Sequence, residues 1–233
     1  MPAAGTTTVF TPSGASSHVV AITASLPATP SHLVNRLLFY GVIDAKFESK
    51  KRLRTELTAA RRAFAATPSF TAANDAIAAE AARRAAGLRV AAYAPLGSEP
   101  GGAAFTETLY ASAAEVWLPI SGDDGQLLWA RYEGTESLAP GALGIGEPTG
   151  PRRDSSLLTE LDLIFVPALA VSPAGVRMGK GAGYYDRALA GVDTDTLVLV
   201  FDDEVREDVP AEPHDAVMNA VLTQSGVRAL PLS

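Results

Sequence analysis

Apolar positions along the chain predict helices that alternate with short strands. In residues 45–65 the apolar side chains recur at helical spacing, with Leu53 and Leu57 on one side and charged residues on the others. A second, alanine-rich helix is expected over residues 72–86, and Gly87 ends it. These two segments would form the helical start of the fold.

Five apolar runs after Gly87 predict strands, at residues 88–95, 114–120, 126–132, 162–167 and 196–201. The last run is almost continuously apolar, which is typical of a buried parallel strand. Helices that alternate with such strands predict an α/β fold, a three-layer sandwich with an open, mainly parallel sheet flanked by helices. In such sheets the ligand loops gather at the carboxyl ends of the strands, where residues 95–99 and 167–183 would lie.

The start of the chain differs from the rest. Residues 1–30 are rich in Thr, Ser, Ala, Pro and Gly and contain no Asp, Glu, Lys or Arg. An apolar run at residues 19–26 lacks the positive flank of a secretory signal. We therefore expect residues 1–45 to be a disordered extension and residues 46–233 to form one catalytic domain.

Charge and cysteine content exclude several classes of protein. The formal net charge is −7, which argues against broad binding to nucleic acid or membrane surfaces. The absence of cysteine excludes disulfides, thiolate nucleophiles and cysteine–zinc sites. No apolar stretch approaches the length of a membrane span. We expect a cytoplasmic monomer that binds small molecules.

The most informative segment is residues 177–187, Arg-Met-Gly-Lys-Gly-Ala-Gly-Tyr-Tyr-Asp-Arg. Glycines at every second position let the backbone approach a ligand and turn successive N–H groups toward one point. Such a nest of amides binds anions, and Arg177 and Lys180 add positive charge beside it. Asp186 adds a carboxylate of the kind that holds magnesium in nucleotide sites. We interpret the segment as a triphosphate-binding loop that leads into a short helix at residues 184–189.

This loop differs from the two common phosphate-binding motifs. The Walker pattern requires Ser or Thr after Gly-Lys, and here Gly181 follows Lys180. The dinucleotide fingerprint requires Gly-x-Gly-x-x-Gly, whereas these glycines alternate strictly. A glycine-rich surface hairpin without a ligand remains the alternative.

Together with residues 162–167, Asp-Leu-Ile-Phe-Val-Pro, the loop resembles the signature of the 5-formyltetrahydrofolate cyclo-ligase family, whose members are also called methenyltetrahydrofolate synthetases. The resemblance covers residues 47–227 and is strongest in the last third. It implies an open sheet flanked by helices, with ATP and a folate meeting in one cleft. It also implies a Lys-x-x-x-Arg pair on the first helix that contacts ATP phosphates, which Lys50 and Arg54 match.

The ATP-binding residues that the resemblance implies are Lys50, Arg54, Arg177, Met178, Gly179, Lys180, Gly181, Ala182, Gly183, Tyr184 and Tyr185. Arg177 and Lys180 are the catalytic candidates, because they would stabilise charge on the transferred phosphoryl group. The remaining candidates are Glu99, Ile145 and Tyr184 for the folate, and Asp186 and Asp215 for Mg²⁺.

Four residues depart from the family pattern or lie at weaker matches. Glu99 continues as Glu-Pro-Gly-Gly instead of Glu-x-x-Thr, and on sequence alone it would be a helix N-cap exposed to water. Gly144 and Ile145 belong to a stretch that resembles Gly-Ile-x-Glu-Pro, although a plain turn is an equal alternative. Glu204 stands where the family usually has glutamine.

Other distinctive side chains are expected to have no role in the site. Lys51, Arg52, Arg61 and Arg62 are interpreted as solvated charges, as is the acidic stretch at residues 202–208. Trp117 and Trp129 are expected in the core.

The reaction that the resemblance implies is ATP-dependent closure of 5-formyltetrahydrofolate to 5,10-methenyltetrahydrofolate, with release of ADP and phosphate. Such phosphoryl transfer depends on positioning and charge neutralisation, which the candidate residues could provide. Two alternatives stay open: a non-catalytic relative that binds folate or nucleotide, and a sugar-phosphate or acyl-CoA enzyme on a related α/β scaffold.

Overall fold

The computed structural model describes residues 31–122, 125–141, 144, 146–212 and 215–232. The chain divides after Val42, and the fold described below belongs to the unit Ile43–Ser233. The predicted extension, residues 1–45, lies mostly outside the described residues, so its boundary stays a prediction. In the described part, no helix has both the length and the hydropathy needed to cross a membrane.

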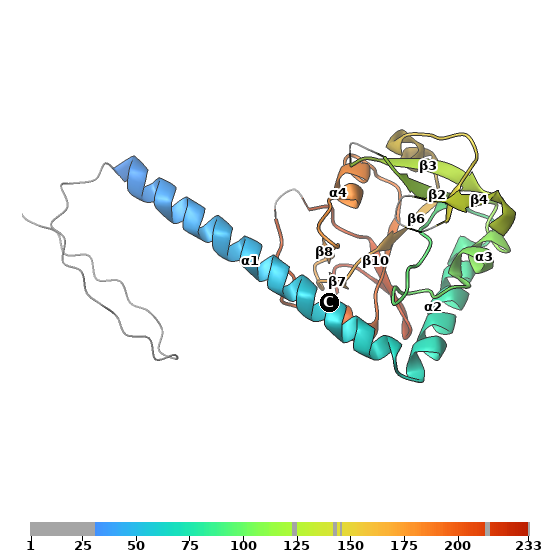
Figure 1. The fold of residues 1–233 in the computed structure, drawn as a ribbon, viewed down its shortest axis with the longest axis horizontal. Coiled ribbons are helices and arrows are strands. Elements are labelled where there is room, and N and C mark those ends of the chain that lie inside the picture. The colour runs from blue at the N-terminus through green and yellow to red at the C-terminus, as the bar shows by residue number, and fades with distance from the viewer. Residues whose placement is uncertain (1–30, 123–124, 142–143, 145, 213–214, 233) are drawn as a thin grey trace, which may run out of the picture. The chain divides into compact units, whose positions relative to one another are not determined.

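Seven strands of the described residues form the central sheet, in the order β11-β10-β9-β6-β1-β2-β3 (Figure 1). They are β1 (Arg89–Ala91), β2 (Glu115–Ser121), β3 (Leu127–Tyr132), β6 (Leu163–Pro167), β9 (Thr196–Leu199), β10 (Ala220–Thr223) and β11 (Gly226–Ala229). The five inner strands are parallel, whereas β3 and β11 pair antiparallel at the two edges. The prediction of a mainly parallel sheet is confirmed.

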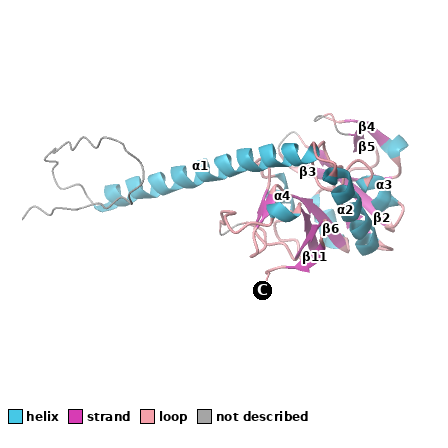
Figure 2. Cartoon of the chain, turned by 90° about the horizontal axis from the view of Figure 1, so that it is seen from below, coloured by secondary structure: helices cyan, strands magenta, loops and turns pink. Residues whose placement is uncertain are grey.

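Helices cover both faces of this sheet. On one face α2 (Ser69–Ala85) and α3 (Phe105–Tyr110) pack on side chains that alternate along the strands, such as Val90 and Phe165. On the other face η2 (Ser155–Glu160) and α4 (Tyr184–Ala188) pack on the intervening side chains, such as Ile164. Both layers can be followed around the sheet in Figures 1 and 2. The three-layer arrangement is therefore confirmed.

Helix α1 (Ser31–Ala65) begins fourteen residues before the start of the predicted charged helix. No proline interrupts the sequence from Ser31 to Ala65, which explains how one helix can continue across it. In the unit Ile43–Ser233, Leu53 and Leu57 pack against the small hairpin of β7 (Ala170–Val171) and β8 (Arg177–Met178). This apolar contact fixes the helix beside the segment that carries the glycine loop.

The remaining elements are short. They are η1 (Thr135–Ser137), the antiparallel pair β4 (Leu138–Pro140) and β5 (Gly146–Pro148), and η3 (Asp202–Glu204). Of these, β5 contributes to the site, because Gly146 and Glu147 line the cavity described next.

Candidate active site

A cavity of about 390 Å³ lies at the carboxyl ends of β1, β2 and β6. Residues after β1, at the end of β2 and after β6 all line it, including Tyr93, Ser121 and Ala168. The chain adds β2 on one side of β1 and β6 on the other, so the cavity lies where the strand order changes direction. Open α/β sheets bind their ligands at this kind of position.

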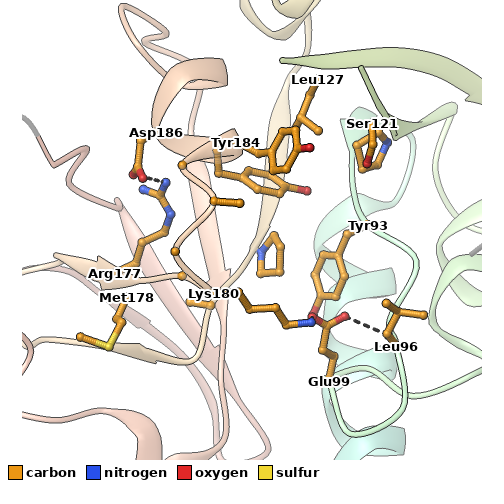
Figure 3. Close-up of a pocket in the computed structure, with 18 of the residues that line it drawn as sticks. Tyr93, Leu96, Glu99, Ser121, Leu127, Arg177, Met178, Lys180, Tyr184 and Asp186 are labelled. Atoms are coloured by element: carbon orange, nitrogen blue, oxygen red, sulfur yellow. Dashed lines mark hydrogen bonds and ion pairs between the residues drawn. The ribbon is translucent and has the colours of Figure 1, made fainter. Parts of the chain in front are cut away.

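The glycine loop forms one wall of the cavity, as Figure 3 shows. All the predicted loop residues from Arg177 to Tyr185 line it. Gly181 and Gly183 have φ angles of +104° and +70°, a backbone region in which other residues are strained. Within the described residues, the N–H groups of residues 179–183 donate no hydrogen bond. The loop therefore presents free amide donors of the kind that bind anions.

Arg177 lies at the base of this loop and is almost completely buried. Its Nη2 donates to Oδ1 of Asp186 at 2.6 Å, which joins the two ends of the loop (Figure 3). Its Nη1 is buried without a hydrogen-bond partner among the described residues. A buried donor without an acceptor is costly, so an anionic ligand at this point would satisfy it.

Lys180 reaches across the cavity to the segment that follows β1. Its Nζ lies 2.6 Å from Oε1 of Glu99, and Oε2 of Glu99 accepts from the N–H of Leu96 at 2.9 Å (Figure 3). The carboxylate of Glu99 is therefore held inside the cavity, and α3 begins only at Phe105. The sequence-based alternative of a helix N-cap in water is wrong, because the turn at Leu96–Glu99 directs the side chain inward.

Helix α1 contributes the two predicted cations. Lys50 forms an ion pair with Glu212 at 2.9 Å, and Nε of Arg54 donates to the carbonyl oxygen of Gly179 at 3.1 Å. Both side chains line the cavity, as expected for residues four positions apart on one helical face. Arg54 also lies close against Gly181, where an added Cβ would be 3.3 Å from its Cζ.

The two tyrosines differ in their surroundings. Tyr184 lies between the glycine loop and Leu127 in Figure 3, and the guanidinium of Arg187 lies over its ring. The ring of Tyr185 packs edge-on against Trp129, with centroids 6.3 Å apart. Burial raises the pKa of the Tyr185 hydroxyl well above its ordinary value, with the Glu99 carboxylate adding to the rise. That hydroxyl is therefore a hydrogen-bond donor at physiological pH.

Asp186 and Asp215, the predicted magnesium ligands, both line the cavity. Oδ1 of Asp186 is bonded to Arg177, and Oδ2 of Asp215 accepts from the N–H of Glu212 at 2.7 Å. The described residues contain no group of three or more His, Cys, Asp or Glu side chains that could hold a metal on its own. Any cation here would need oxygens from a ligand or water.

Several lining residues carry no signal in the sequence. Tyr93 is buried and donates to the carbonyl oxygen of Pro100 at 2.7 Å, and burial next to Glu99 raises its pKa. Glu147 accepts from the N–H of Ser121 at 3.3 Å. Tyr93 follows β1 in a segment without a motif, and only the Gly-Ile-x-Glu-Pro resemblance could have indicated Glu147 in β5. Of the other candidates in that stretch, Gly144 is exposed outside the cavity and Ile145 lies outside the described residues.

One interpretation of the charged residues is wrong. Arg61 and Glu204, expected in solvent, form a buried ion pair in which Nε lies 2.7 Å from Oε1. Arg61 also donates to the carbonyl oxygen of Ala168 at 2.8 Å. Burial raises the pKa of Glu204, and the neighbouring arginine opposes that rise. The pair joins α1 to η3, a long-range contact that a run of local charges cannot reveal.

Comparison with known proteins identifies the same family. A model of the 5-formyltetrahydrofolate cyclo-ligase family matches residues 46–224. The 5-formyltetrahydrofolate cyclo-ligase of Mycolicibacterium smegmatis is 39% identical over 196 residues, which cover 78% of this chain and 97% of that protein. The enzyme of the same name from Escherichia coli is 32% identical over 126 residues, covering 52% and 69%.

Solved structures support the fold. A 5,10-methenyltetrahydrofolate synthetase structure from Aquifex aeolicus has a TM-score of 0.65 at 24% identity, covering 79% of this chain and 94% of that one. A second, from Mycoplasma pneumoniae, has a TM-score of 0.59 at 18% identity, covering 75% and 98%. Because the family model matches most of the chain and close sequence relatives share the family name, this chain belongs to the 5-formyltetrahydrofolate cyclo-ligase family.

Proposed function

We propose that the chain catalyses the ATP-dependent conversion of 5-formyltetrahydrofolate to 5,10-methenyltetrahydrofolate, with release of ADP and phosphate. The observation that carries this proposal is a single cavity with free loop amides and cations on one side and Glu99 and Tyr93 on the other. Its volume of about 390 Å³ lies in the range of ligand pockets. Such a cavity can bring a triphosphate and an organic substrate together.

The reaction consists of two displacements. The formyl oxygen of the substrate attacks the γ-phosphorus of ATP, and the bond between that phosphorus and the bridging oxygen breaks to release ADP. The N10 nitrogen then attacks the activated formyl carbon, the carbon–oxygen bond breaks, and phosphate leaves while N10 loses its proton. The first step gathers negative charge on the transferred group, so positioned cations and amides accelerate it.

The residues on the loop side would hold the triphosphate. Lys50 and Arg54 would contact it from α1, and Arg177 and Lys180 would stabilise the transferred phosphoryl group. The free Nη1 of Arg177 supports this role, because it is a buried donor that lacks an acceptor. Free N–H groups in residues 179–183 would bind the remaining phosphate oxygens.

The residues on the other side would contact the folate. Glu99 is held by the N–H of Leu96, and Tyr184 offers an aromatic surface on the same cavity. A carboxylate and an aromatic ring suit a flat heterocycle that carries N–H donors. Ile145 stays a predicted folate contact, because it lies outside the described residues.

Asp186 and Asp215 fit a bound Mg²⁺ ion. Each carboxylate lines the cavity and uses one oxygen for a bond to the protein, at 2.6 Å and 2.7 Å, which leaves the other oxygen for a cation. Magnesium in nucleotide sites is held by one or two carboxylates, with phosphates and water completing an octahedron. The metal would neutralise phosphate charge when it is bound.

Replacement of the loop carboxylate tests this assignment. Asp186→Asn preserves the shape of the side chain but removes its charge, so turnover should fall by about 100-fold or more, equivalent to about 2.7 kcal/mol. The thermal midpoint should fall as well, because the variant removes the carboxylate charge that pairs with the buried Arg177, so turnover is measured at a temperature where both proteins are folded. Near-normal turnover at saturating magnesium would contradict the metal assignment.

The decisive experiment follows the methenyl-folate absorbance band with purified protein, 5-formyltetrahydrofolate and magnesium, with and without ATP. Growth of the band only when ATP is present supports the proposed reaction. No growth, with ATP still bound, would overturn it and favour the non-catalytic alternative. Binding of a sugar phosphate or CoA instead of ATP would favour the third alternative.

A monomeric state and a cytoplasmic location stay predictions. Light scattering coupled to size-exclusion chromatography tests the first, with an expected mass near 24.2 kDa. Fractionation of the source cells tests the second.

A further inference from the structure

Arg187 lies outside the cavity and contacts the loop that lines it. Its Nη2 donates to the carbonyl oxygen of Ala182 at 3.0 Å, and its Nε donates to the carbonyl oxygen of Gly125 at 3.0 Å. Its guanidinium carbon is 5.5 Å from the centroid of the Tyr184 ring. One side chain thus joins the glycine loop, α4 and the turn between β2 and β3.

Two glycines make room for this side chain. A Cβ atom at Gly183 would be 2.8 Å from Nη1 of Arg187, and one at Gly125 would be 2.9 Å from Nη2. Both glycines also have positive φ angles, of +70° and +77°. The third glycine of the loop therefore serves the contact with Arg187 as well as the approach of a ligand.

The contact with Ala182 fixes the orientation of one peptide plane. In a trans peptide the C=O and the following N–H point in opposite directions. Because Arg187 holds the Ala182 carbonyl from outside the cavity, the N–H of Gly183 is directed away from Arg187. That N–H belongs to the group that donates no hydrogen bond within the described residues.

We propose that Arg187 is a positioning residue for the phosphate-binding loop. It holds the Ala182–Gly183 peptide so that the amide faces the anion and the carbonyl faces away, and it uses the turn at Gly125 as its anchor. Without this contact the Ala182 carbonyl could rotate toward the phosphate, and its oxygen would repel the phosphate oxygens. The inference rests on the proposed function, because the anion that the loop binds would be a phosphate of ATP.

The role requires the shape of arginine and not only its charge. The guanidinium is a planar fork whose donors reach the Ala182 and Gly125 carbonyls together while its face lies over Tyr184. A lysine ammonium keeps the charge but lacks that fork. A comparison of the two residues therefore separates positioning from direct electrostatic attraction.

The test is equilibrium binding of MgATP by calorimetry, without turnover, for the wild type and for Arg187→Ala, Arg187→Lys, Gly125→Ala and Arg228→Ala. We expect Arg187→Ala to raise the Kd for ATP by about tenfold and to leave the Kd for 5-formyltetrahydrofolate within about twofold. Lysine should not restore binding, and Gly125→Ala should behave like Arg187→Ala because its Cβ displaces the guanidinium. Arg228, exposed on the edge strand β11, is the matched control and should bind as the wild type does.

Three results would overturn the inference. They are an unchanged Kd for ATP in Arg187→Ala, full restoration by Arg187→Lys, and a wild type that binds no ATP. A wild type that binds ATP but does not convert 5-formyltetrahydrofolate would overturn the proposed function alone. The two failures are thus distinguishable.

Discussion

Among single residues, Tyr185 has an unusual environment, because its hydroxyl is buried without a hydrogen-bond partner in the described residues. Such a group destabilises a folded protein unless something else compensates. The hydroxyl belongs to a residue that lines the cavity, and its raised pKa keeps it protonated. We infer that a ligand acceptor satisfies it.

The variant Tyr185→Phe separates the effect of this hydroxyl on stability from its effect on substrate binding. Because a buried donor without a partner is removed, stability should stay the same or rise by up to about 1 kcal/mol, a shift of about 2–4 °C in thermal midpoint. The KM should rise by about three- to tenfold for the substrate whose acceptor atom this hydroxyl contacts. Thermal unfolding and steady-state kinetics measure the two effects, and a lower midpoint with unchanged kinetics would contradict this interpretation.

At the same scale, the sequence identifies a residue of the site when its signal is local. Arg177, Lys180 and Asp186 could be predicted because glycines and charges are packed into one short segment. Tyr93 could not, since nothing in its neighbourhood distinguishes a cavity-lining tyrosine from a core tyrosine. The buried partner of Arg61 is 143 positions away, so only the fold reveals it.

Among the elements, α1 sets the cations of the site against the glycine loop. Leu53 and Leu57 pack on the hairpin that carries the loop, and Lys50 and Arg54 therefore face the cavity. Lys51, one position on, is exposed outside the cavity. The helix thus provides a matched pair of adjacent lysines with the same charge and different positions.

This pair yields a prediction with its own control. Lys50→Ala should raise the KM for ATP by about tenfold, equivalent to about 1.4 kcal/mol, and Lys51→Ala should leave it unchanged. Both variants lower the net positive charge of the helix equally, so a general electrostatic effect would appear in both. Equal KM values for the two variants would remove Lys50 from the site.

The elements could be predicted where the apolar pattern is long. The predicted strands at 114–120 and 126–132 and the helix at 72–86 differ from β2, β3 and α2 by at most three residues at either end. The hairpin of β10 and the edge strand β11 was not predicted, because neither strand contains an apolar run longer than three residues. Helix α3, with six residues, is also too short for a periodic signal.

In the molecule as a whole, the site combines segments that are far apart in the chain. Lys50 comes from α1, Glu99 from the segment after β1, and Arg177 from β8. A ligand that contacts all three therefore binds only the folded protein. Binding and folding are then thermodynamically linked.

The linkage predicts stabilisation by the nucleotide. MgATP at about 100 times its Kd should add about 2.7 kcal/mol, a rise of roughly 5–10 °C in thermal midpoint. Removal of magnesium with EDTA should reduce the rise, because phosphate charge would lose its counterion. Scanning calorimetry measures both, and an equal rise with AMP would contradict a triphosphate site.

The paired charges of the cavity have a consequence for ligand selection. Lys50, Arg177 and Lys180 each contact a carboxylate, namely Glu212, Asp186 and Glu99. A monovalent anion can compete with only one of these carboxylates, and it gains little because the cation already has a partner. A triphosphate can meet several cations at once, so each contact after the first forms at high effective concentration. The internal salt bridges therefore favour the binding of multivalent anions, and common monovalent ions compete poorly for the same cleft.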